Sequence, residues 1–195
     1  MSCSEFLSYP VLLLRRFKAG MSKDTALLVI DLQKAMFEEA EPLHAADDLI
    51  DRINLLLVKA RESRIPVIYV QHNEDEGAPL HTNTPGWEFH PAITPTAEDL
   101  IIQKYKPDSF FETNLQQELE AKGIKKLILS GLQTDCCIDA TCRRAVELGY
   151  DVTVVQDAHS TFGQGSRTAE QIIEQYNDAF GAIAELQETS AIDFS

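Results

Sequence analysis

Short apolar runs alternate with longer amphipathic stretches from residue 24 onward. Most of the runs are apolar without in–out alternation, which is typical of strands buried on both faces of a parallel sheet. Six runs predict strands: Thr25–Asp31, Ile65–Gln71, Leu100–Gln103, Lys126–Ser130, Asp151–Val155 and Ala182–Glu185. The sequence predicts helices over Asp47–Arg61, from a Thr113-x-x-Gln116 capping box to Gly123, over Cys137–Leu148 and over Thr168–Asp178.

This alternation predicts a three-layer α/β/α Rossmann-like domain with a mainly parallel sheet of about six strands. We expect residues 24–195 to form the domain and residues 1–23 to form an N-terminal extension or arm. The apolar run Val11–Leu14 precedes its basic residues, which is the reverse of a secretory signal. The irregular stretch from His72 to Pro95 carries the single tryptophan, Trp87, and predicts a flap beside the binding pocket.

Composition and charge narrow the class of partner. The 17 basic and 31 acidic residues give a formal net charge of −14, which disfavours nucleic acid because phosphate backbones are repelled. No apolar run approaches the length of a membrane span. Three of the four cysteines crowd into Cys136–Cys142, which is no disulfide framework and indicates a reducing, cytoplasmic location. A small molecule is the expected partner.

Three reactive residues follow predicted strands. Asp31 ends the first run, Lys104 ends the third, and Cys137 follows the fourth run and opens a helix. Ligands of open parallel sheets bind outside the carboxyl ends of the strands, so these side chains are expected on one rim. The helix dipole and the Lys104 ammonium should lower the pKa of the Cys137 thiol, and Asp31 could accept its proton. Such a set suffices for acyl transfer through a thioester, without metal or organic cofactor.

Each residue also has a plain structural explanation. An aspartate that ends a buried strand often caps a helix, a lysine there is often solvated, and a cysteine after a strand is often simply packed. Their joint placement on one rim is what favours chemistry.

Three segments resemble the isochorismatase-like cysteine hydrolases, which include nicotinamidases and N-carbamoylsarcosine amidohydrolases. They are Ala26–Gln33 with its D-x-Q, Gln103–Leu115 with its K…P-x-S-F-x-x-T-x-L, and Gly131–Thr141 with its G-x-x-T-D-x-C. The similarity runs from about residue 25 to about residue 184. It implies a cysteine hydrolase that cleaves an amide or carbamoyl C–N bond.

The resemblance also implies the parts of the site. The implied triad is Asp31, Lys104 and Cys137, the implied oxyanion donors are the N–H groups of Gln133 and Cys137, and a cis peptide is implied at Leu132–Gln133. Trp87 and Phe110 are predicted to bind substrate. We expect no cofactor. We expect the chain to form homo-oligomers, either dimers or tetramers.

The chain departs from nicotinamidases in one respect. Their metal-binding Asp-x-His has no clear equivalent here, and His72, His81 and His90 lack ligand spacing, so we predict no metal.

Several alternatives stay open. Cys136 competes with Cys137 for the nucleophile role, although the spacing from Thr134 favours Cys137. Lys106 competes with Lys104, but the Pro-x-Ser-Phe that follows fixes the register.

The function has alternatives as well. One is vinyl-ether hydrolysis of the isochorismatase type. Another is a Cys137–His159 dyad oriented by Asp157. A third is a non-catalytic thiol-redox or binding protein.

Overall fold

A single six-stranded sheet organises the chain. The computed structural model describes residues 24–194, so the expected N-terminal extension lies outside the described residues. The strands are β1 (Thr25–Ile30), β2 (Val67–His72), β3 (Leu100–Lys104), β4 (Lys126–Leu132), β5 (Asp151–Ser160) and β6 (Glu185–Gln187). They pair in the order β3-β2-β1-β4-β5-β6, and every pairing is parallel. The predicted parallel sheet is confirmed.

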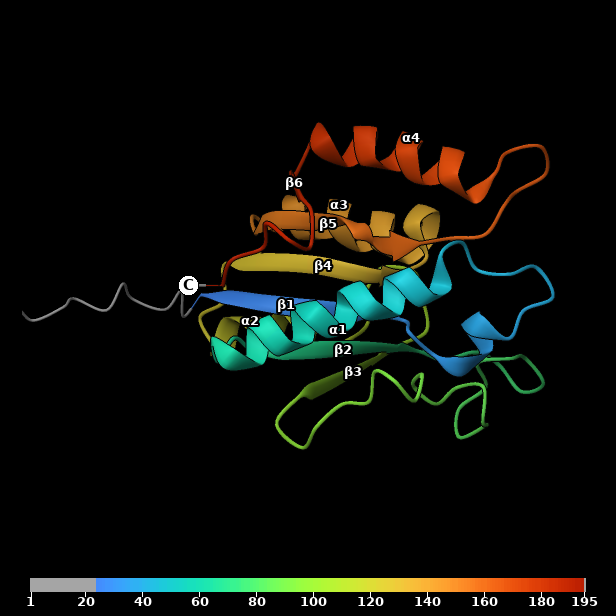
Figure 1. Cartoon of the computed structure of the whole chain (residues 1–195). Coiled ribbons are helices and arrows are strands. Elements are labelled where there is room, and N and C mark those ends of the chain that lie inside the picture. The colour runs from blue at the N-terminus through green and yellow to red at the C-terminus, as the bar shows by residue number, and fades with distance from the viewer. Residues whose placement is uncertain (1–23, 195) are drawn as a thin grey trace, which may run out of the picture.

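Helices cover both faces of the sheet, which makes the predicted three layers (Figure 1). The helix α1 (Ala46–Glu62) crosses one face, and α2 (Leu115–Ala121), α3 (Asp139–Glu147) and α4 (Ala169–Gly181) belong to the other. Successive side chains of β1 feed the two cores, because Leu27 packs with the α1 cluster and Leu28 with the α2–α4 cluster. Both side chains are fully buried, as a central strand without alternation predicts.

Two strands differ from the prediction by more than two residues at one end. The last strand is β6 at Glu185–Gln187, because Ile183 and Ala184 instead donate their N–H groups to the Phe180 carbonyl and close α4. The strand β5 continues past Val155 to Ser160, since a register shift between Leu129 and Gly131 of β4 lets its polar end pair.

The capping box predicted at Thr113 is wrong. The Thr113 hydroxyl donates to the Ser109 carbonyl and accepts from the N–H of Leu115, while Gln116 binds Glu120 instead of reaching back. A complete capping box forms at the start of α4, between Thr168 and Gln171.

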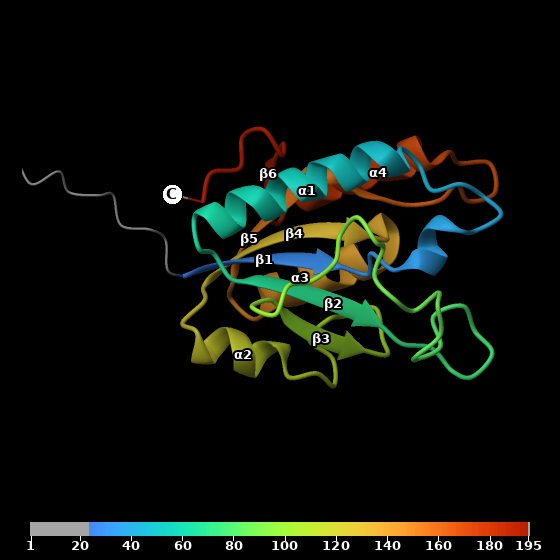
Figure 2. The same cartoon turned by 60° about the horizontal axis from the view of Figure 1, so that its bottom comes forward.

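The segment between β2 and β3, residues 73–99, is the flap. It contains no regular helix and extends beyond the carboxyl ends of β1 and β2 (Figure 2). Main-chain hydrogen bonds tie it to the turn after β1, from Lys34 N–H to the Glu88 carbonyl and from His90 N–H to the Leu32 carbonyl. The flap is therefore fixed beside the rim where strand order reverses between β1 and β4. Within residues 24–194, no helix has the length and apolar character that a membrane crossing requires.

Candidate active site

Asp31, Lys104 and Cys137 meet at this rim. The Nζ atom of Lys104 lies 2.8 Å from Asp31 Oδ2 and 3.1 Å from Cys137 Sγ. The three side chains come from the ends of β1 and β3 and from the turn after β4, and all are buried. The structure thus brings together the three residues that the strand ends predicted.

The Lys104 ammonium is enclosed by hydrogen-bond acceptors. Besides Asp31 and Cys137, it contacts His72 Nδ1 at 3.2 Å and the Lys106 carbonyl at 3.2 Å. Burial acts to lower the pKa of Lys104, but Asp31 and Cys137 outweigh it and raise that pKa above its ordinary value. Lys104 is therefore a permanent cation, and Lys106, whose own side chain is exposed, enters only through its carbonyl.

Sequence reasoning missed the contact between His72 and Lys104. The available signal was that His72 follows the apolar run of β2, much as Asp31 and Lys104 follow theirs. Burial, and next the Lys104 charge, lower the pKa of His72, so its ring is neutral and Nδ1 is an acceptor for the ammonium.

The ligand atoms of Asp31, His72 and Cys137 also lie within 4.8 Å of one another, as metal ligands would. However, the Lys104 ammonium already lies within 3.2 Å of all three side chains. A cation thus occupies the centre of this donor set, and the set does not fit a metal ion.

The turn that carries Cys137 is a π-helical segment, η2 (Thr134–Ile138), between β4 and α3. Its start is fixed by Gly131, which has a φ of +118° and lies so close to β1 that a Cβ atom would meet the Ile30 carbonyl oxygen at 2.1 Å. The Gln133 carbonyl accepts the N–H groups of Cys136 and Ile138, and the peptide bond between Leu132 and Gln133 is cis.

Buried hydroxyl groups join two of the motif segments. The Ser109 hydroxyl and the Thr141 hydroxyl are 2.8 Å apart, and the Ser109 N–H also donates to Thr141. Because Ser109 follows β3 and Thr141 lies on α3, these bonds hold the Lys104 segment against the helix that follows Cys137.

The two adjacent cysteines differ in their contacts. Cys137 Sγ accepts a hydrogen bond from Lys104 and lies 3.9 Å from Cys136 Sγ. The predicted lowering of the Cys137 pKa is wrong. Its hydrogen bond to Cys136, its burial and the Asp31 charge raise that pKa, and they outweigh the effect of Lys104. At rest the Cys137 side chain is therefore a neutral thiol.

Gln33 explains the glutamine of the D-x-Q motif. Its fully buried side chain accepts the His72 N–H at 2.8 Å and donates to the carbonyls of His72 and Trp87, each at 2.9 Å. The end of β2 and the flap are thereby clamped to the turn after β1. The indole N–H of Trp87 donates to Asn73 Oδ1 at 2.8 Å, so it already has a partner within the protein.

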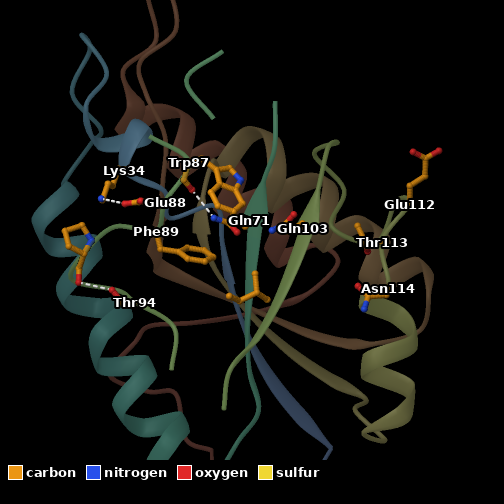
Figure 3. A pocket seen from close by; sticks show the side chains of 12 residues that line it. Lys34, Gln71, Trp87, Glu88, Phe89, Thr94, Gln103, Glu112, Thr113 and Asn114 are labelled. Carbon is orange, nitrogen blue, oxygen red and sulfur yellow. Dashed lines mark hydrogen bonds and ion pairs between the residues drawn. The ribbon is translucent and has the colours of Figure 1, made fainter. Parts of the chain in front are cut away.

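A cavity of about 890 Å³ borders Trp87, and Figure 3 shows the side chains that line it; Asp31, Lys104 and Cys137 are not among them. Gln71 and Gln103 line it, and strand alternation points them away from His72 and Lys104. Phe110 does not line this cavity, and its buried ring stacks on Tyr150 with the ring centroids 5.8 Å apart. Substrate binding by Trp87 and Phe110 stays a prediction that these contacts do not support.

A second cavity, of about 290 Å³, lies over the rim itself. The segments that follow β1, β2, β4 and β5 each contribute to it, through Met36, Glu74, Gln133 and Phe162. It therefore occupies the point where strand order reverses, the usual ligand position in a doubly wound sheet. Gln133 connects it to the Cys137 turn.

His159 has partners other than Cys137. Its Nδ1 lies 2.9 Å from the Thr134 hydroxyl and its Nε2 lies 2.9 Å from Asn177 Oδ1, which occupies both ring nitrogens. Asp157 accepts from Thr189 and pairs with Arg52. The alternative dyad of Cys137 and His159 oriented by Asp157 is not formed, and His159 instead braces the start of η2.

Most of the described chain matches known proteins. A model of the isochorismatase domain matches residues 25–188. Streptothricin hydrolase of Streptomyces noursei is 36% identical over 137 residues, which are 70% of this chain and 50% of that protein, so the match spans half the length of that relative. The uncharacterized isochorismatase family protein YddQ of Bacillus subtilis (strain 168) is 39% identical over 140 residues, covering 70% of this chain and 78% of its own. The crystal structure of N-carbamoylsarcosine amidase from Thermoplasma acidophilum superposes with a TM-score of 0.75 at 25% identity, covering 87% of this chain and 98% of that one.

Proposed function

The chain belongs to the isochorismatase family of hydrolases, and we propose that it is a cysteine amidohydrolase that cleaves a C–N bond of a small amide or carbamoyl compound through a thioester. The observation that carries this proposal is the buried Lys104 ammonium in contact with both a carboxylate and a thiol. A hydrolase of streptothricin and an amidase of N-carbamoylsarcosine among the matched proteins support it.

The first half of the reaction moves one proton from Cys137 to Asp31. One Asp31 carboxylate oxygen lies within 4.8 Å of Cys137 Sγ, a separation that a proton crosses through one bridging water. The Lys104 ammonium stabilises the thiolate as it forms, and the thiolate attacks the carbonyl carbon. The N–H groups of Gln133 and Cys137 hold the oxyanion. The C–N bond then breaks as Asp31 returns the proton to the departing nitrogen.

The second half hydrolyses the thioester. Asp31 accepts a proton from water, the resulting hydroxide adds to the acyl carbon, and the C–S bond breaks. Asp31 then returns the proton to the Cys137 thiolate. Asp31 Oδ1 suits this repeated exchange, because it is buried and has no hydrogen-bond partner in the described structure while Oδ2 stays on Lys104.

His72 is a positioning residue in this scheme. As a neutral acceptor on Lys104, it holds the ammonium between Asp31 and Cys137 without adding a second positive charge.

The test is to trap the thioester. The purified chain is mixed with a panel of primary amides, N-carbamoyl amino acids and isochorismate, quenched in acid and analysed by peptide mass spectrometry. We expect an acyl adduct on Cys137, no turnover by Cys137→Ala, and retention of the adduct by the matched control Cys136→Ser.

Other outcomes contradict the proposal. A Cys137→Ala chain as active as the parent would end it, and a Cys137→Ser chain that still consumes isochorismate would favour vinyl-ether hydrolysis. A Cys137 that iodoacetamide labels and no amide protects would favour a thiol-redox protein.

A further inference from the structure

This inference rests on the amidase activity proposed above, which leaves the substrate class open. The cavity over the rim indicates that class. We propose that this cavity selects amides that carry a positive charge, such as an ammonium group, on the part of the molecule that does not react. The proposal depends on the walls of the cavity, on the charges around it and on one unpartnered carboxylate oxygen, that of Asp31, at the same rim.

The walls combine apolar surface with carboxylates. Met36, Leu80 and Phe162 provide apolar surface for a carbon chain, and Gln133 joins the cavity to the Cys137 turn. The three ionisable lining residues are all acidic, Glu39, Glu41 and Glu74, and no lysine, arginine or histidine lines the cavity.

The negative charge of these carboxylates is not compensated locally. None of the three forms an ion pair with any residue from 24 to 194. Glu74 accepts one hydrogen bond, from the N–H of Leu80 at 2.9 Å, which fixes its carboxylate without neutralising it.

Two lysines of the segments that form the rim are already paired. Lys34 forms an ion pair with Glu88, and Lys104 forms one with Asp31. The mouth of the site thus keeps a net negative charge.

The catalytic rim supplies an independent observation. Asp31 is 3% exposed, and its Oδ1 atom has no hydrogen-bond partner among the described residues. A buried carboxylate oxygen without a donor is costly, so a substrate N–H is the natural partner for it. Asp31 lies in the segment that follows β1, and the same segment contributes Ala35 and Met36 to the cavity wall.

Electrostatics then gives the expected preference. A cleft lined by charges of one sign within low-dielectric walls concentrates ligands of the opposite sign about tenfold or more at low salt and excludes ligands of the same sign. The cavity volume of about 290 Å³ suits a short aliphatic chain that ends in a cation.

The experiment reads the charge preference without requiring amide turnover. Three chloroacetamides of matched length are used, N-(3-aminopropyl)-, N-butyl- and N-(2-carboxyethyl)-2-chloroacetamide. Each alkylates a thiolate, forming an S–C bond as chloride leaves and the thiol proton is lost. The Cys136→Ser chain is labelled, so that Cys137 is the only reactive thiol of that turn, and the rate is followed by intact mass and peptide mapping.

We expect the cationic reagent to label Cys137 about tenfold faster than the butyl reagent, and the anionic reagent to be the slowest. The rate difference between the reagents should shrink several-fold between about 20 mM and about 500 mM salt. This measurement requires no further variant. A triple variant should abolish the rate difference between the reagents; its substitutions are Glu39→Gln, Glu41→Gln and Glu74→Gln. Glu62→Gln, at the far end of α1, is the matched control and should leave it unchanged.

Equal rates, a reversed order, or a preference that survives the triple substitution and high salt would overturn the proposal. Hydrolysis of 6-aminohexanamide, hexanamide and adipic monoamide by the wild-type chain separates the two hypotheses. If none is hydrolysed but the labelling preference holds, the amidase proposal fails alone. If all three are hydrolysed at equal rates, the charge selection fails alone.

Discussion

Lys104 and Asp31 form a buried ion pair with an Nζ–Oδ2 distance of 2.8 Å at the meeting point of two strand ends. Removing charges from water costs several kcal/mol for each ion, and breaking such a pair on one side leaves an uncompensated buried charge. The pair therefore couples the stability of the fold to the chemistry of the site.

This coupling predicts non-additive stability changes. Lys104→Met and Asp31→Asn should each lower the free energy of unfolding by about 3 kcal/mol or more, whereas the double variant should lose less than the sum. Urea denaturation followed by circular dichroism measures all four corners of the cycle. Strict additivity would contradict the interpretation of the pair as mutually dependent.

The half-buried Cys136 thiol should be acidic only while Cys137 is present. The hydrogen bond from Cys137 is the main cause that lowers the pKa of Cys136 to about 7. Cys137→Ala removes this donor, so the pKa of Cys136 should rise toward its ordinary value and alkylation by iodoacetamide at neutral pH should slow. The pH dependence of labelling at Cys136, compared with the same profile in a Cys142→Ala chain, measures the shift. An unchanged profile would assign the acidity to another cause.

His159 predicts a loss of stability in mild acid. Burial lowers its pKa from 6.5 to about 4, so the unfolded chain binds the proton first as the pH falls. Stability should therefore be complete above about pH 6.5 and fall between there and about pH 4, by up to about 3 kcal/mol from this residue. His159→Gln should flatten that part of the profile in urea titrations at several pH values. A variant as pH-sensitive as the parent would place the effect elsewhere.

Chelation should not affect amide hydrolysis. The Lys104 ammonium occupies the centre of the donor set of Asp31, His72 and Cys137, so dialysis against EDTA should leave activity unchanged. Addition of Co²⁺ to the purified chain should produce no thiolate charge-transfer absorbance at Cys137. Loss of activity on chelation, restored by metal, would show that a metal displaces the ammonium.

Self-association is the last prediction. The resemblance implies homo-oligomers, and the edge strand β3 and the segment after it expose the large apolar side chains Ile101 and Phe111, 44% and 48% accessible. Sedimentation should give a mass above the 21.8 kDa of one chain, and Ile101→Asp should lower it. A monomer at all concentrations would contradict both expectations.

The sequence predicted the strands best where burial dominates. The strand β1 and all of β4 after Lys126 are buried and are mostly apolar in sequence, so the positions of both strands were found within two residues. The polar end of β5 was not predicted, because its pairing depends on a register shift in the neighbouring strand β4. The three reactive residues were found because parallel strands end on one rim.

The pKa values and the charge distribution of the site could not be predicted from the sequence pattern. The raised pKa of Cys137 depends on the side-chain positions of Cys136 and Asp31, which spacing does not give. The acidic cavity combines Glu39 and Glu41 from one connection with Glu74 from another, and only the folded path of both segments brings them together.

Part of the anchorage of the flap lies in its backbone. The bonds from Lys34 N–H to the Glu88 carbonyl and from Ala35 N–H to the Gly86 carbonyl exist whatever residues stand at 86 and 88. Gly86 is the exception, since a Cβ there would lie 2.6 Å from the Pro79 carbonyl oxygen. Mutations in this loop, Gly86 excepted, can therefore leave these main-chain hydrogen bonds in place. In laboratory evolution, this loop is the place to diversify when altered binding is sought while Asp31, Lys104 and Cys137 are kept.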